Sequence, residues 1–340
     1  IISKTKEILK KVNPESLWIG SSLDGLGDTY DKIRGVSGGF KGFIETLEFF
    51  KKELPLVRFS ATFVLTPYNI DQLLPCWEFA DKNNIDFFAQ FGVPKQARSG
   101  DVFQWDDREL ARIEVYINQI IERMIKKVSS PEDFGKSLVT AHDKINLLTK
   151  IYYWSHLVDF QKTHMRFSYN CNAAFKFAML DPYGNTFFCP LLKHKTLGNI
   201  RDNTIDNIWS SRAADETRDF IGSGKCSCWL VCTVFPIVGK ALSLYGDKSA
   251  RDISIGRKAD ILRQDIGAGE GLKPSPALES VKSNHELNEK EFRHRKIILE
   301  SMPHGVTIGA NYKCNANCTF CLGGNYKPFN LKMYKNYFEP

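Results

Sequence analysis

The last three cysteines of the chain constrain its folding more than any other feature of the sequence. Cys314, Cys318 and Cys321 fall within eight residues, shortly after the apolar run Val306–Ile308. Three thiols this close, on a loop after a predicted strand, can surround a single metal cluster. Ferredoxin cubanes use four thiolates, so a cubane held by three keeps one iron without a protein ligand. An open coordination position marks reactive metal sites, and the spacing therefore predicts a catalytic iron–sulfur centre.

This CxxxCxxC pattern resembles the hallmark of the radical S-adenosylmethionine (radical SAM) family, including the aromatic Phe320 before the third cysteine. In that family the pattern follows the first strand of a β/α barrel. The resemblance implies that the open iron of a 4Fe–4S cluster binds S-adenosylmethionine and cleaves it reductively to a 5′-deoxyadenosyl radical, which abstracts hydrogen from substrate. The alternative is a structural zinc site, but neither a second CxxC pair nor an HxxxH follows Cys321.

Cysteine usage and composition bound the class of protein. Eight of the nine cysteines fall in two groups, within 171–232 and 314–321, which favours metal over disulfides and a reducing cytoplasm. Cys76 stands alone in a helical pattern and is expected to be a small buried hydrophobe. A length of 340 residues suggests two domains. The net charge of +7 forms no long basic block, and no run of 18 apolar residues occurs, so we expect neither nucleic acid nor a membrane as partner.

Strand-like and helical segments alternate through the first 165 residues. The predicted strands span 17–25, 57–65 and 85–91, and the predicted helices between them span 40–50 and 70–83. Such alternation indicates a parallel sheet with right-handed crossovers, either a barrel or a doubly wound sheet.

A long amphipathic helix is predicted from Asp106 to Val128, with Asp106 and Glu109 at capping-box spacing. A second helical stretch is predicted over 132–162. The histidines His142, His156 and His164 lack partners at ligand spacing and are expected to be surface or packing residues.

Ser22-Leu23-Asp24-Gly25 and Arg34 resemble a mid-barrel stretch of the radical SAM family. The resemblance implies that Ser22 meets the ribose of S-adenosylmethionine and that Arg34 meets its carboxylate. A hydroxyl can serve a ribose diol, and a guanidinium binds a carboxylate bidentately. A turn serine and a surface arginine are the alternative.

The middle cysteines resemble the SPASM domain, and its shorter Twitch relative, which follow the barrel in many radical SAM enzymes. Twelve residues separate Cys171 from Gly184, and four separate Gly184 from Cys189. Cys226, Cys228 and Cys232 follow. Residues 181–185 (DPYGN) predict a hairpin turn, which would set the two flanking cysteine segments side by side.

The match to SPASM is incomplete. Five thiols can fill only one cubane, so we predict one auxiliary 4Fe–4S cluster, with Cys171, Cys189 and Cys232 as its firmest ligands. Cys226 or Cys228 is the fourth, and zinc is the alternative metal. Pro190 stands where the sulfatase-maturing members carry a catalytic aspartate, which argues against that activity.

The order of these parts is unusual. Residues 246–291 contain no aromatic residue, which predicts a flexible or loosely helical linker. We therefore expect the carboxyl-terminal part of a radical SAM (β/α) barrel at 1–165, a small α+β SPASM/Twitch-like iron–sulfur domain at 166–240, a linker at 241–300, and the start of a second radical SAM domain at 301–340. The chain then resembles a piece of a tandem enzyme.

These features together predict a radical SAM enzyme of α/β fold class. Its cofactors would be a radical SAM cluster, an auxiliary cluster and S-adenosylmethionine. The family resemblance implies a peptide, protein or cofactor-precursor substrate and a reductant such as flavodoxin or ferredoxin. The alternative from another class is a non-catalytic iron–sulfur or zinc scaffold, or an electron carrier.

Overall fold

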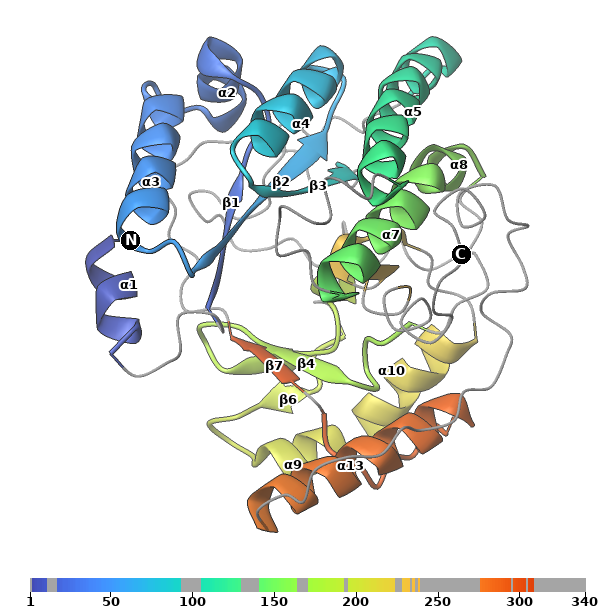
Figure 1. Cartoon of the computed structure of the whole chain (residues 1–340). Helices are drawn as coiled ribbons and strands as arrows, with labels where there is room; N and C mark the ends of the chain where they lie inside the picture. The colour runs from blue at the N-terminus through green and yellow to red at the C-terminus, as the bar shows by residue number, and fades with distance from the viewer. Residues whose placement is uncertain are drawn as a thin grey trace. The chain divides into compact units, whose positions relative to one another are not determined.

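The structure is a computed structural model. It describes residues 2–10, 17–92, 105–129, 141–163, 171–192, 195–223, 228–232, 234–235, 238, 276–294, 296–303 and 305–308. The described residues up to Thr163 form one compact unit, and those from Cys171 onward form another. The chain is mixed α/β, with a parallel sheet in the first unit and a mixed sheet in the second (Figure 1).

The first unit is built on a three-stranded parallel sheet in the order β1-β2-β3. Its strands are β1 (Trp18–Ser22), β2 (Arg58–Leu65) and β3 (Asp86–Phe91). Helices α2 (Gly27–Arg34) and α3 (Gly39–Glu53) connect β1 to β2, while a 3₁₀ turn (Ile70–Gln72) and α4 (Leu73–Lys82) connect β2 to β3. The predicted alternation of strands and helices is confirmed. The barrel stays a prediction, because the three described strands form an open sheet.

Aromatic side chains make up much of this core. The central strand β2 buries Phe63 completely. Phe59, on the same strand, lies with its ring centroid 5.5 Å from that of Phe50 on α3. On β3, Phe87 contacts Trp154 at 6.1 Å between ring centroids. Burial of rings of this size dominates the energetics of small cores, so these contacts fix the helices on the sheet.

The described residues of this unit include four further helices. They are α1 (Ile2–Ile8), α5 (Asp107–Ser129), α7 (Ala141–Ser155) and α8 (Leu157–Thr163). The last two replace the single predicted stretch over 132–162, of which 132–140 lies outside the described residues. His156, at the junction of α7 and α8, is buried, and its Nδ1 contacts the Tyr152 carbonyl at 2.9 Å. It is therefore a packing residue, whereas His164 lies outside the described residues.

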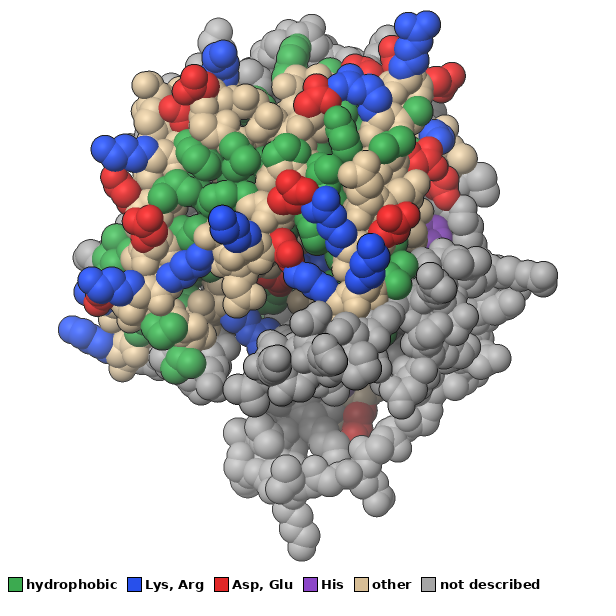
Figure 2. All heavy atoms as spheres, turned by 45° about the horizontal axis from the view of Figure 1, so that its top comes forward, with side chains coloured by type: hydrophobic (Ala, Val, Ile, Leu, Met, Phe, Trp, Pro, Cys, Tyr) green, Lys and Arg blue, Asp and Glu red, His purple; other side chains and the backbone are tan. Residues whose placement is uncertain are grey.

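Helix α5 lies against α4 and the 3₁₀ turn that precedes it, with charges paired across the contact. Asp71 and Asp81 accept hydrogen bonds from Arg112 and Lys127. Figure 2 shows acidic and basic side chains interspersed on this face. Exposed pairs of this kind are each worth at most about 1 kcal/mol, so they set the alignment of the two helices more than the stability of the unit.

The second unit has a four-stranded sheet in the order β6-β5-β4-β7. Its strands are β4 (Phe177–Leu180), β5 (Asn185–Phe187), β6 (Gly198–Asn199) and β7 (Gly305–Ile308). Strands β4, β5 and β6 pair antiparallel, and β7 pairs with β4 in parallel. The predicted strand at 306–308 therefore exists. Among the described strands its partner is β4.

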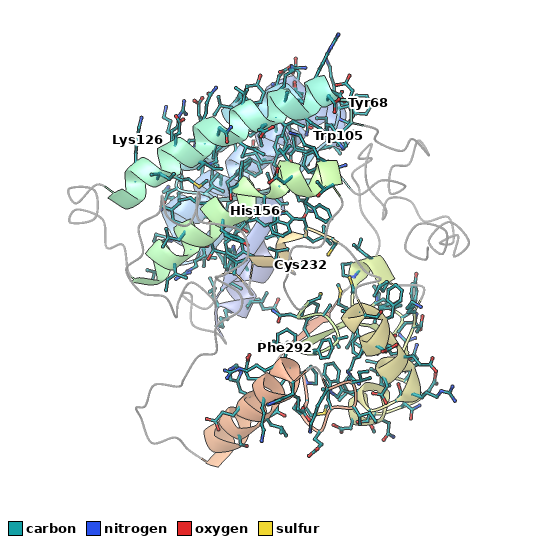
Figure 3. All side chains as sticks on the ribbon, turned by 90° about the vertical axis from the view of Figure 1, so that its right-hand side faces the viewer. Tyr68, Trp105, Lys126, His156, Cys232 and Phe292 are labelled. Atoms are coloured by element: carbon teal, nitrogen blue, oxygen red, sulfur yellow. The ribbon has the colours of Figure 1, made fainter. Side chains whose placement is uncertain are left out.

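The described part of the second unit also contains helices α9 (Ile205–Trp209), α10 (Arg212–Gly222) and α13 (Pro276–Arg293). Helix α13 falls in the segment whose composition predicts a linker. Asn288 of α13 is buried and donates to the Phe175 carbonyl at 2.7 Å. Phe292, visible on α13 in Figure 3, meets Phe175 edge to face at 5.5 Å. Helix α13 is thus held by a buried hydrogen bond as well as by an aromatic contact. A count of aromatic residues in the sequence does not detect the hydrogen bond.

None of the described helices is long and apolar enough to cross a membrane.

Asp106 and Glu109 cap the start of α5 reciprocally, as their spacing in the sequence predicts. The Glu109 N–H donates to Asp106 Oδ1 at 2.7 Å, and the Asp106 N–H donates to Glu109 Oε2 at 3.1 Å. We predict that Asp106→Ala lowers the free energy of unfolding by about 1 kcal/mol, while Asp106→Ser, which keeps an acceptor, loses less. Urea titration followed by circular dichroism measures both, and equal losses would contradict the cap.

Candidate functional site

A tight hairpin organises the segment around the middle cysteines. The Asp181 carboxylate accepts hydrogen bonds from the Tyr183 N–H at 2.8 Å and the Asn185 N–H at 2.9 Å, and this closes the turn between β4 and β5. Met179 then pairs with Phe187. The predicted hairpin is confirmed, and its chemistry is the aspartate turn that the sequence indicates.

Gly184 is the turn position that the geometry restricts most. Its φ of +88° lies in the left-handed region, which glycine adopts without steric cost. A Cβ atom there would also approach Asn199 Oδ1 to 2.7 Å. Asn199 in turn donates to the Asn185 side chain at 3.0 Å. The glycine therefore lets β6 close against the hairpin.

Cys171 and Cys189 flank this hairpin at the same end. Cys171 precedes β4 and Cys189 follows β5, and both are buried. The Leu191 N–H donates to the Cys189 sulfur at 3.4 Å. A backbone donor on sulfur favours the thiolate, which is the form that binds metal, and it tunes a bound cluster. The pair therefore has the chemistry that an iron–sulfur centre requires.

Cys228 and Cys232 form a second pair. Cys232 is exposed as a residue, yet protein surrounds its thiol closely enough that burial, and then repulsion from Cys228, raises its pKa to about 11. Thiolates are the ligands that an iron–sulfur cluster takes, so both residues have suitable donor atoms. Cys226 lies outside the described residues.

The structure does not assemble the predicted ligands into a complete centre. Within the part of the chain that it describes, no three His, Cys, Asp or Glu side chains are grouped closely enough to hold a metal ion. It shows two cysteine pairs whose donors suit an iron–sulfur cluster, since such clusters take thiolates. Cys314, Cys318 and Cys321 lie outside the described residues.

The predicted S-adenosylmethionine ligands lie at the carboxyl edge of the first sheet. Ser22 is the last residue of β1, and Arg34 ends α2. Arg34 donates from Nη1 to the Asp24 carboxylate at 3.2 Å. This bond orients the guanidinium and uses one of its five N–H groups. Carboxyl ends of parallel strands are the usual place for sites in such folds.

Asp24 and Asn69 organise the surroundings of Arg34, a role that was not predicted from the sequence. Asp24 is fully buried and accepts the Val64 N–H at 2.8 Å. Asn69 donates to the Asp24 carbonyl at 2.9 Å and accepts from the Thr66 N–H at 2.8 Å. These bonds join the ends of β1 and β2 and fix Asp24, which accepts the hydrogen bond from Arg34. The available signal was a carboxylate directly after Leu23, an apolar residue that is buried at the end of the predicted strand.

A groove of about 560 Å³ opens at the other edge of the sheet. Leu56, Arg58, Asp86 and Lys150 are among its lining residues, at the amino ends of β2 and β3. Ser22, at the carboxyl end of β1, does not line it. The groove therefore does not coincide with the predicted site.

The carboxyl of Asp24 has a raised pKa because it is buried. Burial raises the pKa of its carboxyl from 3.8 to about 6, against the opposing effects of the Val64 hydrogen bond and of Arg34. Because the folded-state pKa is the higher one, the folded protein binds this proton more tightly than the unfolded chain does. The resulting stabilisation is complete below pH about 4 and is lost as the pH rises through about 6.

We therefore predict that Asp24→Asn flattens the pH dependence of stability. Between pH about 4 and about 6, the unfolding free energy of the wild-type apoprotein should fall by up to about 3 kcal/mol relative to the variant. The asparagine keeps an oxygen for the Val64 N–H. Denaturant titrations at several pH values measure the difference, and parallel profiles would refute it.

Comparison with known proteins addresses the hairpin and its cysteines. Residues 171–233 match the family model of the SPASM iron–sulfur cluster-binding domain, and this segment falls within the predicted range 166–240. No curated protein and no solved structure matches the chain. The matched segment runs from Cys171 through the hairpin and past Cys232. The iron–sulfur cluster-binding domain supports the assignment of this chain to the radical SAM/SPASM type of protein.

Proposed function

We propose that this chain acts as a radical SAM enzyme, in the cytoplasm. It would cleave S-adenosylmethionine reductively and use the 5′-deoxyadenosyl radical to abstract hydrogen from a peptide, protein or cofactor-precursor substrate. A flavodoxin or ferredoxin would supply electrons. The first unit would be part of a radical SAM barrel, and Cys314 would begin the cluster motif of a second one.

The SPASM match over residues 171–233 carries the proposal. This domain binds iron–sulfur clusters and is found in radical SAM enzymes. The CxxxCxxC pattern at Cys314, Cys318 and Cys321 supports it independently, because three thiolates leave one iron of a cubane open. Nothing in the described residues favours the scaffold alternative, which the experiment below separates from the enzyme.

The roles of the residues follow from their chemistry. Cys314, Cys318 and Cys321 would hold the radical SAM cluster, which supplies the electron that splits the sulfonium bond. Arg34 would bind the carboxylate of S-adenosylmethionine, with Asp24 fixing the direction of its guanidinium through the 3.2 Å bond. Ser22, at the strand end, would serve the ribose hydroxyls.

The auxiliary site would use the thiols around the hairpin. Cys171, Cys189 and Cys232 would be ligands, with Cys226 or Cys228 as the fourth. The Leu191 N–H already donates to the Cys189 sulfur, and it would continue to do so in the bound state. Pro190, the neighbour of Cys189, stands where the sulfatase-maturing members carry a catalytic aspartate, which argues against that activity.

Anaerobic reconstitution of the 340-residue chain tests the proposal. We expect about eight iron atoms per chain, for two cubanes of four, and 5′-deoxyadenosine on reduction with dithionite in the presence of S-adenosylmethionine. Cys318→Ala should abolish 5′-deoxyadenosine formation and halve the iron, since a radical SAM cubane needs all three thiols. About one zinc per site without cleavage would instead establish the scaffold.

The auxiliary ligands are tested separately by iron content. Cys189→Ala should lower the iron by about four atoms per chain while Cys314, Cys318 and Cys321 still bind theirs. Cys76→Ala is the matched control, because Cys76 is buried on α4 outside either cysteine group. Chemical iron analysis and electron paramagnetic resonance distinguish the variants. Unchanged iron in Cys189→Ala would remove this residue from the ligand set.

A further inference from the structure

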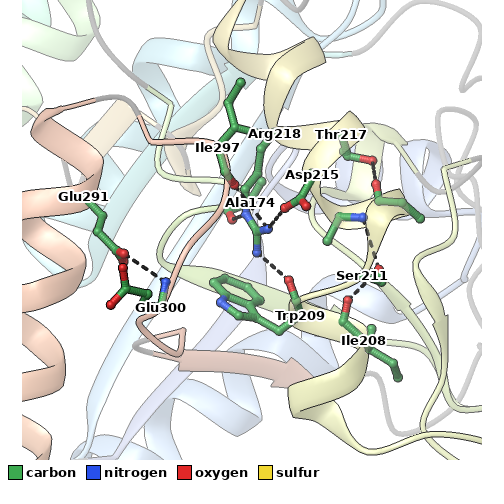
Figure 4. Close-up of polar contacts among 12 residues, drawn as sticks. Ala174, Ile208, Trp209, Ser211, Asp215, Thr217, Arg218, Glu291, Ile297 and Glu300 are labelled. Atoms are coloured by element: carbon green, nitrogen blue, oxygen red, sulfur yellow. Dashed lines mark hydrogen bonds and ion pairs between the residues drawn. The ribbon is translucent and has the colours of Figure 1, made fainter.

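Arg218 of α10 is a fully buried charged group in the described part of the second unit. Its side chain is fully buried, with 0% exposure. The guanidinium donates to the Ala174 carbonyl at 3.0 Å, to the Trp209 carbonyl at 2.8 Å and to Asp215 at 2.9 Å (Figure 4). Contacts in several directions at once hold the group in one orientation.

Two aromatic rings lie against the same guanidinium. Its central carbon is 5.1 Å from the ring centroid of Phe188 and 4.7 Å from that of Trp209. The rings themselves meet edge to face at 5.3 Å. Trp209 is anchored in turn, because its indole N–H donates to the Ser301 carbonyl at 2.7 Å. Cation–π contacts of this kind are strongest where water is excluded.

These contacts involve both loops that carry the hairpin cysteines. Ala174 lies three residues after Cys171, and Phe188 directly precedes Cys189. Ala174 also has a φ of +72°, a conformation that a residue with a Cβ atom adopts only when its surroundings impose it. The hydrogen bond from Arg218 to its carbonyl is one of the contacts that hold it there.

The cost of burying this charge indicates a role beyond packing. An apolar side chain of similar volume is often as stabilising as a buried ion pair, or more so. Burial lowers the pKa of Arg218 to about 10, in spite of the nearby Asp215 and Glu291 carboxylates. The group therefore stays charged at neutral pH, and it forms an ion pair with Asp215 at 2.9 Å.

We propose that Arg218 is a positioning residue for the auxiliary cluster, which fixes the separation of the Cys171 and Cys189 loops and supplies a positive charge to their surroundings. The inference rests on the proposed function, since it requires a cluster at these thiols. Hydrogen bonding and charge around the sulfurs set the potential of such clusters. Arg218 would therefore influence both cluster retention and reduction potential.

The sign of the electrostatic effect follows from charge balance. A cubane held by four thiolates is anionic, and it becomes more negative when it accepts one electron. A nearby cation stabilises the reduced form and raises the midpoint potential. Replacing Arg218 by methionine would remove this cation and leave Asp215 without its guanidinium partner, so the potential should fall.

The test uses full-length protein in which Cys314, Cys318 and Cys321 are all changed to alanine, so that only the auxiliary cluster contributes to the signals. Dithionite titration followed by electron paramagnetic resonance gives the midpoint potential, and iron release to a chelator gives the retention. Arg218→Met removes the charge, and Arg218→Lys keeps it without the planar fork that reaches several carbonyls. Arg212→Met on the same helix is the matched control, because its side chain is 92% exposed.

We expect a lower potential and several-fold faster iron release in Arg218→Met. In Arg218→Lys the potential should stay near that of the parent protein while iron release is faster. Arg212→Met should match the parent in both. Should Arg218→Met fail to fold, Arg218→Lys decides, and parent-like iron release there would overturn the inference. A parent protein that binds no iron would instead overturn the proposed auxiliary cluster.

Discussion

Pairing between β4 and β5 is the constraint on which the candidate cluster site depends. Cys171 and Cys189 are separated along the chain, and only the antiparallel hairpin brings their segments to one end of a sheet. The pairing in turn requires the Asp181 turn and a residue that tolerates a φ of +88° at position 184. A shift of the pairing register by one residue would turn the side chains of the shifted strand to the opposite face of the sheet. The placement of the two thiols therefore depends on this register.

The features that the sequence predicts well are formed by residues close together in the chain. The cap at Asp106 and Glu109 and the turn at Asp181 are each formed by groups three or four residues apart, and both appear in the structure as expected. Periodicity likewise located the three strands of the first unit and its helices α3, α4 and α5, because burial of one face per element leaves a repeating signal. These features need no knowledge of the tertiary fold.

Interactions between distant residues were not predictable in this way. Asn69 bonds Asp24 across 45 positions, and Arg218 bonds Ala174 across 44. A lone asparagine or arginine in a sequence gives no sign of such a partner. The same holds for the candidate sites. Cysteine spacing indicates which residues can be ligands, but the hydrogen bonds from Arg34 to Asp24 and from the Leu191 N–H to Cys189 are seen only in the structure.

The parallel pairing of β7 with β4 has a consequence for biosynthesis. Asn288 reaches Phe175 across 113 positions, and β7 completes the sheet from still later in the chain. A ribosome therefore releases the hairpin long before the segments that close over it. Long-range pairing of this kind is slow and exposes apolar surface in the meantime. The second unit consequently cannot finish folding during translation until residue 308 has emerged from the exit tunnel.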